Sequence, residues 1–278
     1  MISQLKPDER KTLFHKNLIH IDSVNELDVN NVLSSLKSSG FCCIRGLISE
    51  DEIRKSRKVF ISRFSSKLDS PSVGETPEDI QHNFQKLRVG ISPAKPQNSR
   101  LVRTIFNPLW EEDIFELHNS FRKMIKLRNY LLCKPATFAL DGTEEGLWTA
   151  SRLQHYPTGG GFMSAHRDEL VINAATDAGL GFLQLLLVLS EKGKDYLSGG
   201  GFIIKDNKFI DIEEEACLGD IILYDGDTVH GVDTIDPHKS LDLNTPSGRL
   251  VGFVTLYKDL SGRDERQSTI SSRYEHLS

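Results

Sequence analysis

Two histidines and one aspartate are spaced so that they could hold a metal ion. His166 and Asp168 are two positions apart, so in an extended segment their side chains point to the same face, and His230 follows much later. Two imidazoles and one carboxylate form a three-ligand face that leaves other metal positions open. Arg249, further along, carries a planar cation that can clamp a carboxylate with two hydrogen bonds. We predict an open metal site beside an anion site, with no catalytic residue beyond the ligands.

Short strands must position these residues. From about residue 147 the chain changes to short β-type runs separated by Gly, Asp, Asn and Pro, a pattern that indicates a sandwich or jelly roll. The interval between Asp168 and His230 accommodates several strands, which is typical of a barrel that returns to its starting edge. The predicted strands are 148–156, 180–189, 202–204, 209–212, 220–224 and 250–257.

The N-terminal half is predicted to support this core. Apolar spacing predicts a helix over 23–39 that Gly40 ends, a strand over 41–47, a helix capped by Ser49, and a long helix from Trp110 to Leu132. Residues 66–100 are polar and predict a long loop, either a lid or a surface excursion. We predict one catalytic domain over 1–278, with 1–146 as helical and strand support, 147–260 as the jelly-roll core and 261–278 as a tail. The N-terminal 22 residues read as an arm.

The composition disfavours nucleic acid and membranes as partners. Lys plus Arg number 34 against 39 Asp plus Glu, a formal charge of -5, so no global positive field attracts nucleic acid or an anionic membrane. No run approaches the ~18 apolar residues of a membrane span. The four cysteines lack a disulfide or metal-binding spacing and predict buried free thiols in a reducing compartment. We therefore expect a cytoplasmic protein, and its oligomeric state stays open.

Further motifs surround the metal ligands in a set order. They are Tyr156 before a Gly-rich turn, His166 and Asp168, the Leu197-Ser-Gly-Gly turn, Gly219-Asp before the strand into His230, and Arg249 on the last core strand. This order resembles that of the Fe(II)/2-oxoglutarate-dependent dioxygenases, particularly the prolyl-hydroxylase-like branch, over roughly 153–256. The residues from Gly40 to Ile53 also resemble the entry strand and helix of phytanoyl-type members, as a looser match. The resemblance implies a mainly β fold with a double-stranded β-helix core (jelly roll, cupin-like) and a helical flank.

The resemblance also implies roles. His166, Asp168 and His230 would bind Fe(II), and Arg249 would pair with the distal carboxylate of the co-substrate, 2-oxoglutarate. The candidates beside the co-substrate are Tyr156, Thr255 and, more weakly, Gln154. The interval from His230 to Arg249 spans 19 positions, longer than is common in this branch, so 236–248 is either a surface loop or a cover over the substrate. His238 within it is expected to be exposed.

The implied activity is hydroxylation of an unactivated C–H bond with O2. Asp168 fills the position that related halogenases leave for chloride, which favours oxygen transfer. The helical flank favours a small metabolite of amino-acid, sugar or natural-product type. The alternatives are a peptidyl or protein hydroxylase, an oxidase performing desaturation or cyclisation, and a cupin-like binding or isomerase domain. The candidate substrate contacts are Arg152, Arg167, Glu169 and Asn173.

Overall fold

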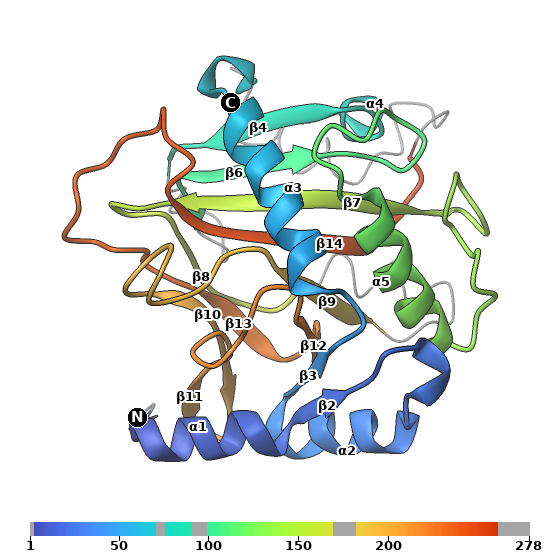
Figure 1. Ribbon diagram of the computed structural model, residues 1–278, viewed down its shortest axis with the longest axis vertical. Helices are drawn as coiled ribbons and strands as arrows, with labels where there is room; N and C mark the ends of the chain where they lie inside the picture. Colours follow the sequence, from blue (N-terminus) through green and yellow to red (C-terminus); the bar gives the residue numbers. More distant parts are fainter. Residues whose placement is uncertain (1–2, 71–75, 91–98, 169–181, 261–278) are drawn as a thin grey trace, which may run out of the picture.

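Two β-sheets dominate the computed structural model, which describes residues 3–70, 76–90, 99–168 and 182–260. Within this part, one sheet is six-stranded, in the order β1-β11-β10-β13-β8-β5, and the other is eight-stranded, in the order β2-β3-β12-β9-β14-β7-β6-β4 (Figure 1). The predicted mainly β fold is confirmed. The strands are β1 (Ser3–Gln4), β2 (Leu18–His20), β3 (Phe41–Arg45), β4 (Phe84–Arg88), β5 (Ser99–Arg100), β6 (Val102–Phe106), β7 (Leu147–Pro157), β8 (Phe162–His166), β9 (Leu183–Val188), β10 (Gly200–Lys205), β11 (Lys208–Asp211), β12 (Ile221–Asp225), β13 (Val229–Asp233) and β14 (Gly248–Lys258).

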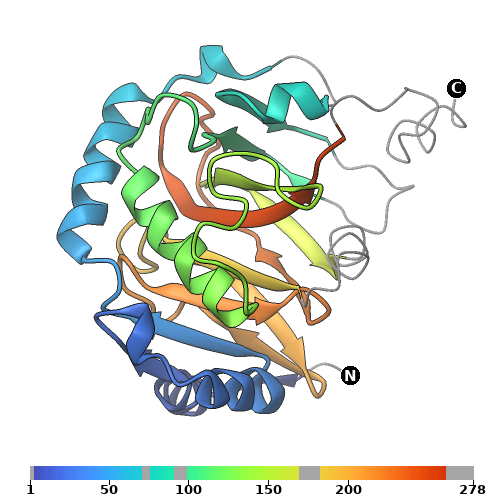
Figure 2. The ribbon, with the colours of Figure 1, turned by 90° about the vertical axis from the view of Figure 1, so that its right-hand side faces the viewer.

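Helices cover the outer face of the eight-stranded sheet. Figures 1 and 2 show α3 and α5 on the same side of this sheet, with α1 and α2 along its lower end. Side chains of α2, α3 and α5, among them Val32, Ile53 and Phe121, pack with sheet residues in one core cluster. The helices are α1 (Pro7–Lys16), α2 (Val29–Ser39), α3 (Glu50–Arg63), α4 (Pro77–Ile80) and α5 (His118–Leu131), with 3-10 turns η1 (Val24–Glu26) and η2 (Ser66–Leu68).

Alternation along β9 shows how the sequence builds two cores. Leu185 and Leu187 pack with the helices, whereas Leu186 and Val188 pack with Ile203 of β10, on the other sheet. Successive strand residues point to opposite faces, so a strand buried on both faces needs a continuous apolar run. The space between the sheets is therefore walled by every second residue of β7, β9 and β14.

The N-terminal arm belongs to the core of the fold. β1 pairs with β11 in the smaller sheet and β2 pairs with β3 in the larger one. Phe14 of α1 lies in the core cluster between the sheets, at 2% exposure. The helix predicted over 23–39 is α2 with the preceding turn η1, and Gly40 ends it in the left-handed conformation, at φ 82°.

Two sequence predictions about the first half are wrong. The helix predicted to begin at Trp110 begins at His118, because Glu116 has a left-handed φ of 55° and the Asp113 carboxylate accepts hydrogen bonds from the first turn. Residues 66–100 hold α4 and β4 rather than one long loop, since Phe84 and Ile80 pack beside Trp148 at the sheet edge. Residues 71–75 and 91–98 lie outside the described part.

The cysteines are free, and two of the four are buried as predicted. Cys42 and Cys43 lie in β3, whereas Cys133 is exposed and Cys217 is half-buried. In the described ranges, no helix combines the length and apolar character that crossing a bilayer requires.

Candidate active site

Neighbouring strands of the smaller sheet bring the predicted metal ligands together. β8 and β13 run antiparallel with His166 directly opposite His230, and the centroids of the two imidazole rings are 4.3 Å apart. Asp168 follows β8, and its backbone N–H donates to the Gly226 carbonyl at 3.1 Å. The pairing of two short strands that the sequence pattern did not resolve as separate elements thus places all three side chains.

The donor atoms converge on one point. Nε2 of His166 lies 3.4 Å from Oδ1 of Asp168, and Nε2 of His230 lies 3.4 Å from Oδ2. The three ligand atoms lie within 4.8 Å of one another. Nδ1 of each histidine is 2.8 Å from a backbone carbonyl two residues earlier, so Nδ1 carries the proton and Nε2 keeps its lone pair. This arrangement fits a divalent metal ion.

Asp168 is held as a carboxylate. Burial alone would raise its pKa, but the adjacent His166 and His230 rings and the hydrogen bond from Gln184 outweigh burial and hold the pKa well below its usual range. Nε2 of Gln184 donates to Oδ2 of Asp168 at 2.8 Å, and Thr255 donates to Oε1 of Gln184 at 3.0 Å. Gln184 is a residue that the sequence analysis missed, although it is the one polar side chain in the apolar run 182–189.

A cavity of about 220 Å³ between the sheets contains the metal-ligand group. It includes the predicted Arg152, Gln154, Tyr156 and Arg249. It does not include Thr255, whose hydroxyl instead donates to Gln184, a residue of the cavity wall. The lining residues are Arg152, Gln154, Tyr156, Met163, His166, Asp168, Gln184, Leu186, Gly201, Phe202, Ile212, Tyr224, His230, Gly231, Val232, Arg249, Phe253 and Tyr257.

Other predicted contacts are not brought to the cavity. Arg167 is half-exposed and makes an ion pair with Asp227 at 2.9 Å, because the residue between His166 and Asp168 points away from the metal side. Glu169 and Asn173 lie outside the described residues. No residue of 236–248 lines the cavity, and His238 is exposed as expected.

Arg249 is already engaged by a carboxylate of the protein. Its Nε lies 2.8 Å from Oε2 of Glu213, and its Nη2 also donates to this carboxylate. Tyr196 and the Gly201 N–H donate to Oε2 of Glu213 at 2.7 and 2.9 Å. Burial alone would raise the pKa of Glu213, but the charge and hydrogen bonds of Arg249 hold it below the usual value. The bidentate contact of Arg249, which was predicted to bind a co-substrate carboxylate, is thus made with Glu213.

One donor of Arg249 remains. Nη1 is buried and has no hydrogen-bond partner among the described residues. The guanidinium carbon lies 5.0 Å from the centroid of the Tyr156 ring, and the Tyr156 hydroxyl donates to Oε1 of Gln154 at 3.0 Å. Burial raises the pKa of Tyr156 to about 12, so its hydroxyl stays protonated at neutral pH. Nη1 therefore fits a carboxylate bound inside the cavity.

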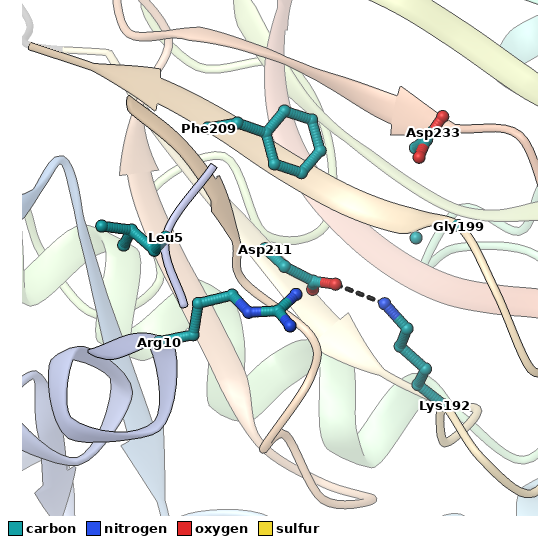
Figure 3. A pocket seen from close by; sticks show the side chains of 8 residues that line it. Leu5, Arg10, Lys192, Gly199, Phe209, Asp211 and Asp233 are labelled. Atoms are coloured by element: carbon teal, nitrogen blue, oxygen red, sulfur yellow. Dashed lines mark hydrogen bonds and ion pairs between the residues drawn. The ribbon is translucent and has the colours of Figure 1, made fainter. Parts of the chain in front are cut away.

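A second cavity, of about 110 Å³, lies beside α1. Figure 3 shows Lys192 joined to Asp211 on its wall, with Arg10 entering from the N-terminal helix. Arg10 also pairs with Glu214 at 2.8 Å. Nε of Arg10 has no hydrogen-bond partner among the described residues. This second cavity does not contain the metal-ligand group.

Comparison with known proteins places the fold. Neither a protein-family model nor a curated protein matches the chain. Among solved structures, a prolyl hydroxylase of Trichoplax adhaerens in complex with a hypoxia inducible factor peptide fragment is 13% identical, with 91% of this chain and 94% of that chain covered, at a TM-score of 0.50. A Pseudomonas putida prolyl-4-hydroxylase is 16% identical, with 82% of this chain and 98% of that chain covered, at a TM-score of 0.45. A 2OG-Fe(II) oxygenase family member from Burkholderia pseudomallei is 9% identical, with 88% and 99% covered, at 0.48.

The chain has a double-stranded β-helix fold, as expected from the motif order, and shares this fold with the Trichoplax adhaerens prolyl hydroxylase. At this identity the likeness is one of fold.

Proposed function

We propose that this protein is an Fe(II)- and 2-oxoglutarate-dependent oxygenase that hydroxylates an unactivated C–H bond of a small metabolite. The observation that carries the proposal is a single cavity that joins the His166, Asp168 and His230 group to the buried, unpartnered Nη1 of Arg249. A site that binds only a metal ion has no use for a buried arginine with a free N–H donor. A site that binds a metal ion and a co-substrate carboxylate would use both the metal ligands and the Nη1 donor of Arg249.

The residues of the chain would hold the metal ion and the co-substrate and would exclude water. Nε2 of both histidines and the Asp168 carboxylate would bind Fe(II), and Gln184 would keep the carboxylate in position. Nη1 of Arg249 would hold the distal carboxylate of 2-oxoglutarate. Leu186, among other apolar cavity residues, would exclude water. Bound iron, together with 2-oxoglutarate and O2, supplies the oxidising power for C–H hydroxylation.

The small, walled cavity supports a small metabolite as the substrate. The alternative of a peptidyl substrate is raised by the Trichoplax adhaerens protein, whose structure contains a peptide fragment. Desaturation or cyclisation would use the same ligands, and product mass distinguishes them from hydroxylation. A cupin-like binding or isomerase domain would form no succinate.

The test is succinate formation with Fe(II), 2-oxoglutarate and O2 against a metabolite library, with product mass recorded. His166→Ala should lower succinate formation by more than about 100-fold, because two ligands hold the ion poorly. His238→Ala is the matched control, since His238 is exposed outside the cavity. Metal binding is measured separately by titration with Mn(II). Full turnover by His166→Ala without added iron would refute the proposal, and a peptide as the sole substrate would reverse the substrate preference.

The co-substrate site needs a paired variant. Arg249→Met alone would leave Glu213 buried without a partner, which costs about 3 to 5 kcal/mol of stability, so it is combined with Glu213→Gln. The double variant should raise the KM for 2-oxoglutarate about 100-fold while Mn(II) affinity stays within about twofold. An unchanged KM would place the distal carboxylate elsewhere.

A further inference from the structure

A second buried guanidinium lines the same cavity, and no carboxylate of the described residues pairs with it. Arg152 of β7 is 5% exposed and lines the cavity with the metal-ligand group. Within the described ranges its sole hydrogen-bond contact is from Nη1 to the Ala150 carbonyl, at 3.1 Å. Its guanidinium carbon lies 5.1 Å from the ring centroids of both Phe253 and Tyr257. The rings hold the guanidinium in place but bring no negative charge to it.

Arg128 shows what a structural buried arginine looks like in this protein. It is 1% exposed and likewise has no carboxylate partner within the described part of the chain, but all three of its nitrogens donate hydrogen bonds. These go to the carbonyls of Val254 and Phe138 and to side-chain oxygens of Thr149 and Asn129. Arg128 does not line the metal-containing cavity. Arg152 differs in both respects, since it lines the cavity and its Nε and Nη2 have no acceptor among the described residues.

The charges around the cavity leave Arg152 as the uncompensated cation. Arg249 is neutralised by Glu213, and Asp168 faces the metal position between two histidines. Burying a cation is costly unless an anion accompanies it. The described part of the cavity wall contains no lysine and no further arginine, and Asp168 is taken up by the metal-ligand group, so Arg152 is the one cation of this wall without a carboxylate beside it. A planar guanidinium pairs with a carboxylate through two parallel hydrogen bonds.

Strand register separates the two arginines. On β14, Arg249 lies opposite Tyr156 and Phe253 lies opposite Arg152, so the arginines start four residues, or about 13 Å, apart along the strands. Thr255, two residues beyond Phe253, is tied through Gln184 to Asp168. Arg152 therefore lies nearer than Arg249 to the level of Thr255 along the strands, on the β7 side of β14, whereas Gln184 lies on the β9 side.

We propose that Arg152 anchors a carboxylate of the primary substrate, which makes that substrate a small carboxylic acid. The proposal rests on the oxygenase function proposed above, because it assigns Arg249 to the co-substrate. The Arg152 guanidinium would form a charge-assisted pair with the substrate carboxylate, and the Phe253 and Tyr257 rings would fix its orientation. The substrate C–H bond to be oxidised would then lie at a set distance from its own carboxylate.

The experiment uses the Mn(II)- and 2-oxoglutarate-loaded protein without O2. The probes are monocarboxylic acids from acetate to hexanoate, benzoate and the L-amino acids, each compared with its own carboxamide by calorimetry and thermal shift. Wild-type protein should bind at least one acid about 10- to 100-fold more tightly than its amide, and Arg152→Gln should abolish this preference. Arg152→Lys should restore part of it. Arg122→Gln, an exposed arginine of α5, is the control and should keep the preference.

The outcomes separate the two proposals. Arg152→Gln should leave the affinity for 2-oxoglutarate within about twofold, since Arg249 is intact. If Arg152→Gln instead weakens 2-oxoglutarate binding and leaves the acid preference unchanged, Arg152 serves the co-substrate and the proposal is overturned. A wild-type protein in which no acid binds more tightly than its amide overturns it also. Failure of wild-type protein to bind Mn(II) and 2-oxoglutarate would defeat the proposed function itself.

Discussion

Gln184 connects the metal-ligand group to the sheet. It interrupts an apolar strand, where a polar side chain is costly unless its hydrogen bonds are made, and both ends of its amide are bonded, to Asp168 and to Thr255. The amide therefore fixes which way the Asp168 carboxylate faces. Residues that orient a metal ligand in this way affect affinity without touching the ion.

We expect Gln184→Leu to weaken Mn(II) binding about 10- to 100-fold with the fold retained, because Asp168 loses its fixed orientation. Thr255→Val, which leaves the Gln184 contact to Asp168 in place, should have a smaller effect. Metal titration followed by circular dichroism measures both. Equal Mn(II) affinity in Gln184→Leu and wild-type protein would contradict this role.

Glu213 is a residue whose burial cannot be predicted from residue type alone. It is the first of three consecutive glutamates, a run that resembles a solvated surface, yet it is 4% exposed and pairs with Arg249. Glu214 and Glu215 stay partly exposed beside it. The end of β11 sets which of the three points inward, and residue type does not.

Among the strands, β14 contains a position, Gly248, where the backbone leaves no room for a side chain. It pairs with β7 along its whole length, and it starts at Gly248, next to Arg249. Gly248 has φ 133°, and a Cβ there would lie 2.1 Å from the Tyr156 carbonyl oxygen. Only glycine allows the two strands to approach this closely where the anion site begins.

Gly248→Ala should therefore lower the free energy of unfolding by about 2 to 4 kcal/mol and displace Arg249, raising the KM for 2-oxoglutarate. Gly142→Ala is the matched control: a Cβ at Gly142 meets nothing within 4 Å, so stability should change by less than about 1 kcal/mol. Urea unfolding measures both variants. Equal midpoints for the two variants would show that the strand start tolerates a side chain.

At the scale of the whole molecule, buried charges join segments that are distant in sequence. Arg103, at 0% exposure, donates to both carboxylate oxygens of Asp69 at 2.7 Å and to the Leu243 carbonyl at 3.1 Å. Its Nη1 lies 3.1 Å from Nδ1 of His155, which must accept, so His155 is neutral and its Nε2 donates to the Ser247 carbonyl. This cluster fastens the loop between β13 and β14 to the outer face of the larger sheet.

His155 makes stability depend on pH. Burial, followed by the positive charge of Arg103, lowers its pKa from 6.5 to about 4. The unfolded chain binds the proton first as the pH falls, so the stabilisation is complete above pH 6.5 and about 3 kcal/mol is lost between pH 6.5 and 4. His155→Asn keeps an acceptor for Arg103 but does not titrate, so its unfolding free energy should fall less over this range. Identical pH profiles in urea unfolding would rule out this contribution.

Much of the fold was predictable because the buried positions of a strand or helix recur as a local pattern of apolar residues in the sequence. The alternating and continuous apolar runs predicted β7, β9, β12 and β14 to within a few residues, and Gly40 and Ser49 marked a helix end and a helix start. The long helix was placed too early, since Asp113 and Glu116 stop it by a hydrogen-bonded turn rather than by a break in the apolar pattern. β4 was missed because an edge strand needs few apolar side chains.

The sequence by itself determined the ligand types and the order of the strands that carry them, since residue types and apolar patterns are local properties of the chain. The tertiary structure decided which side chains share the cavity. It paired Glu213 with Arg249, tied Thr255 to Gln184 and turned Arg167 outward. It also placed Arg152 in the wall of the metal-containing cavity, where no carboxylate of the described residues pairs with it. Such pairings join residues far apart in the chain and depend on sheet register and facing strands, which no local pattern records.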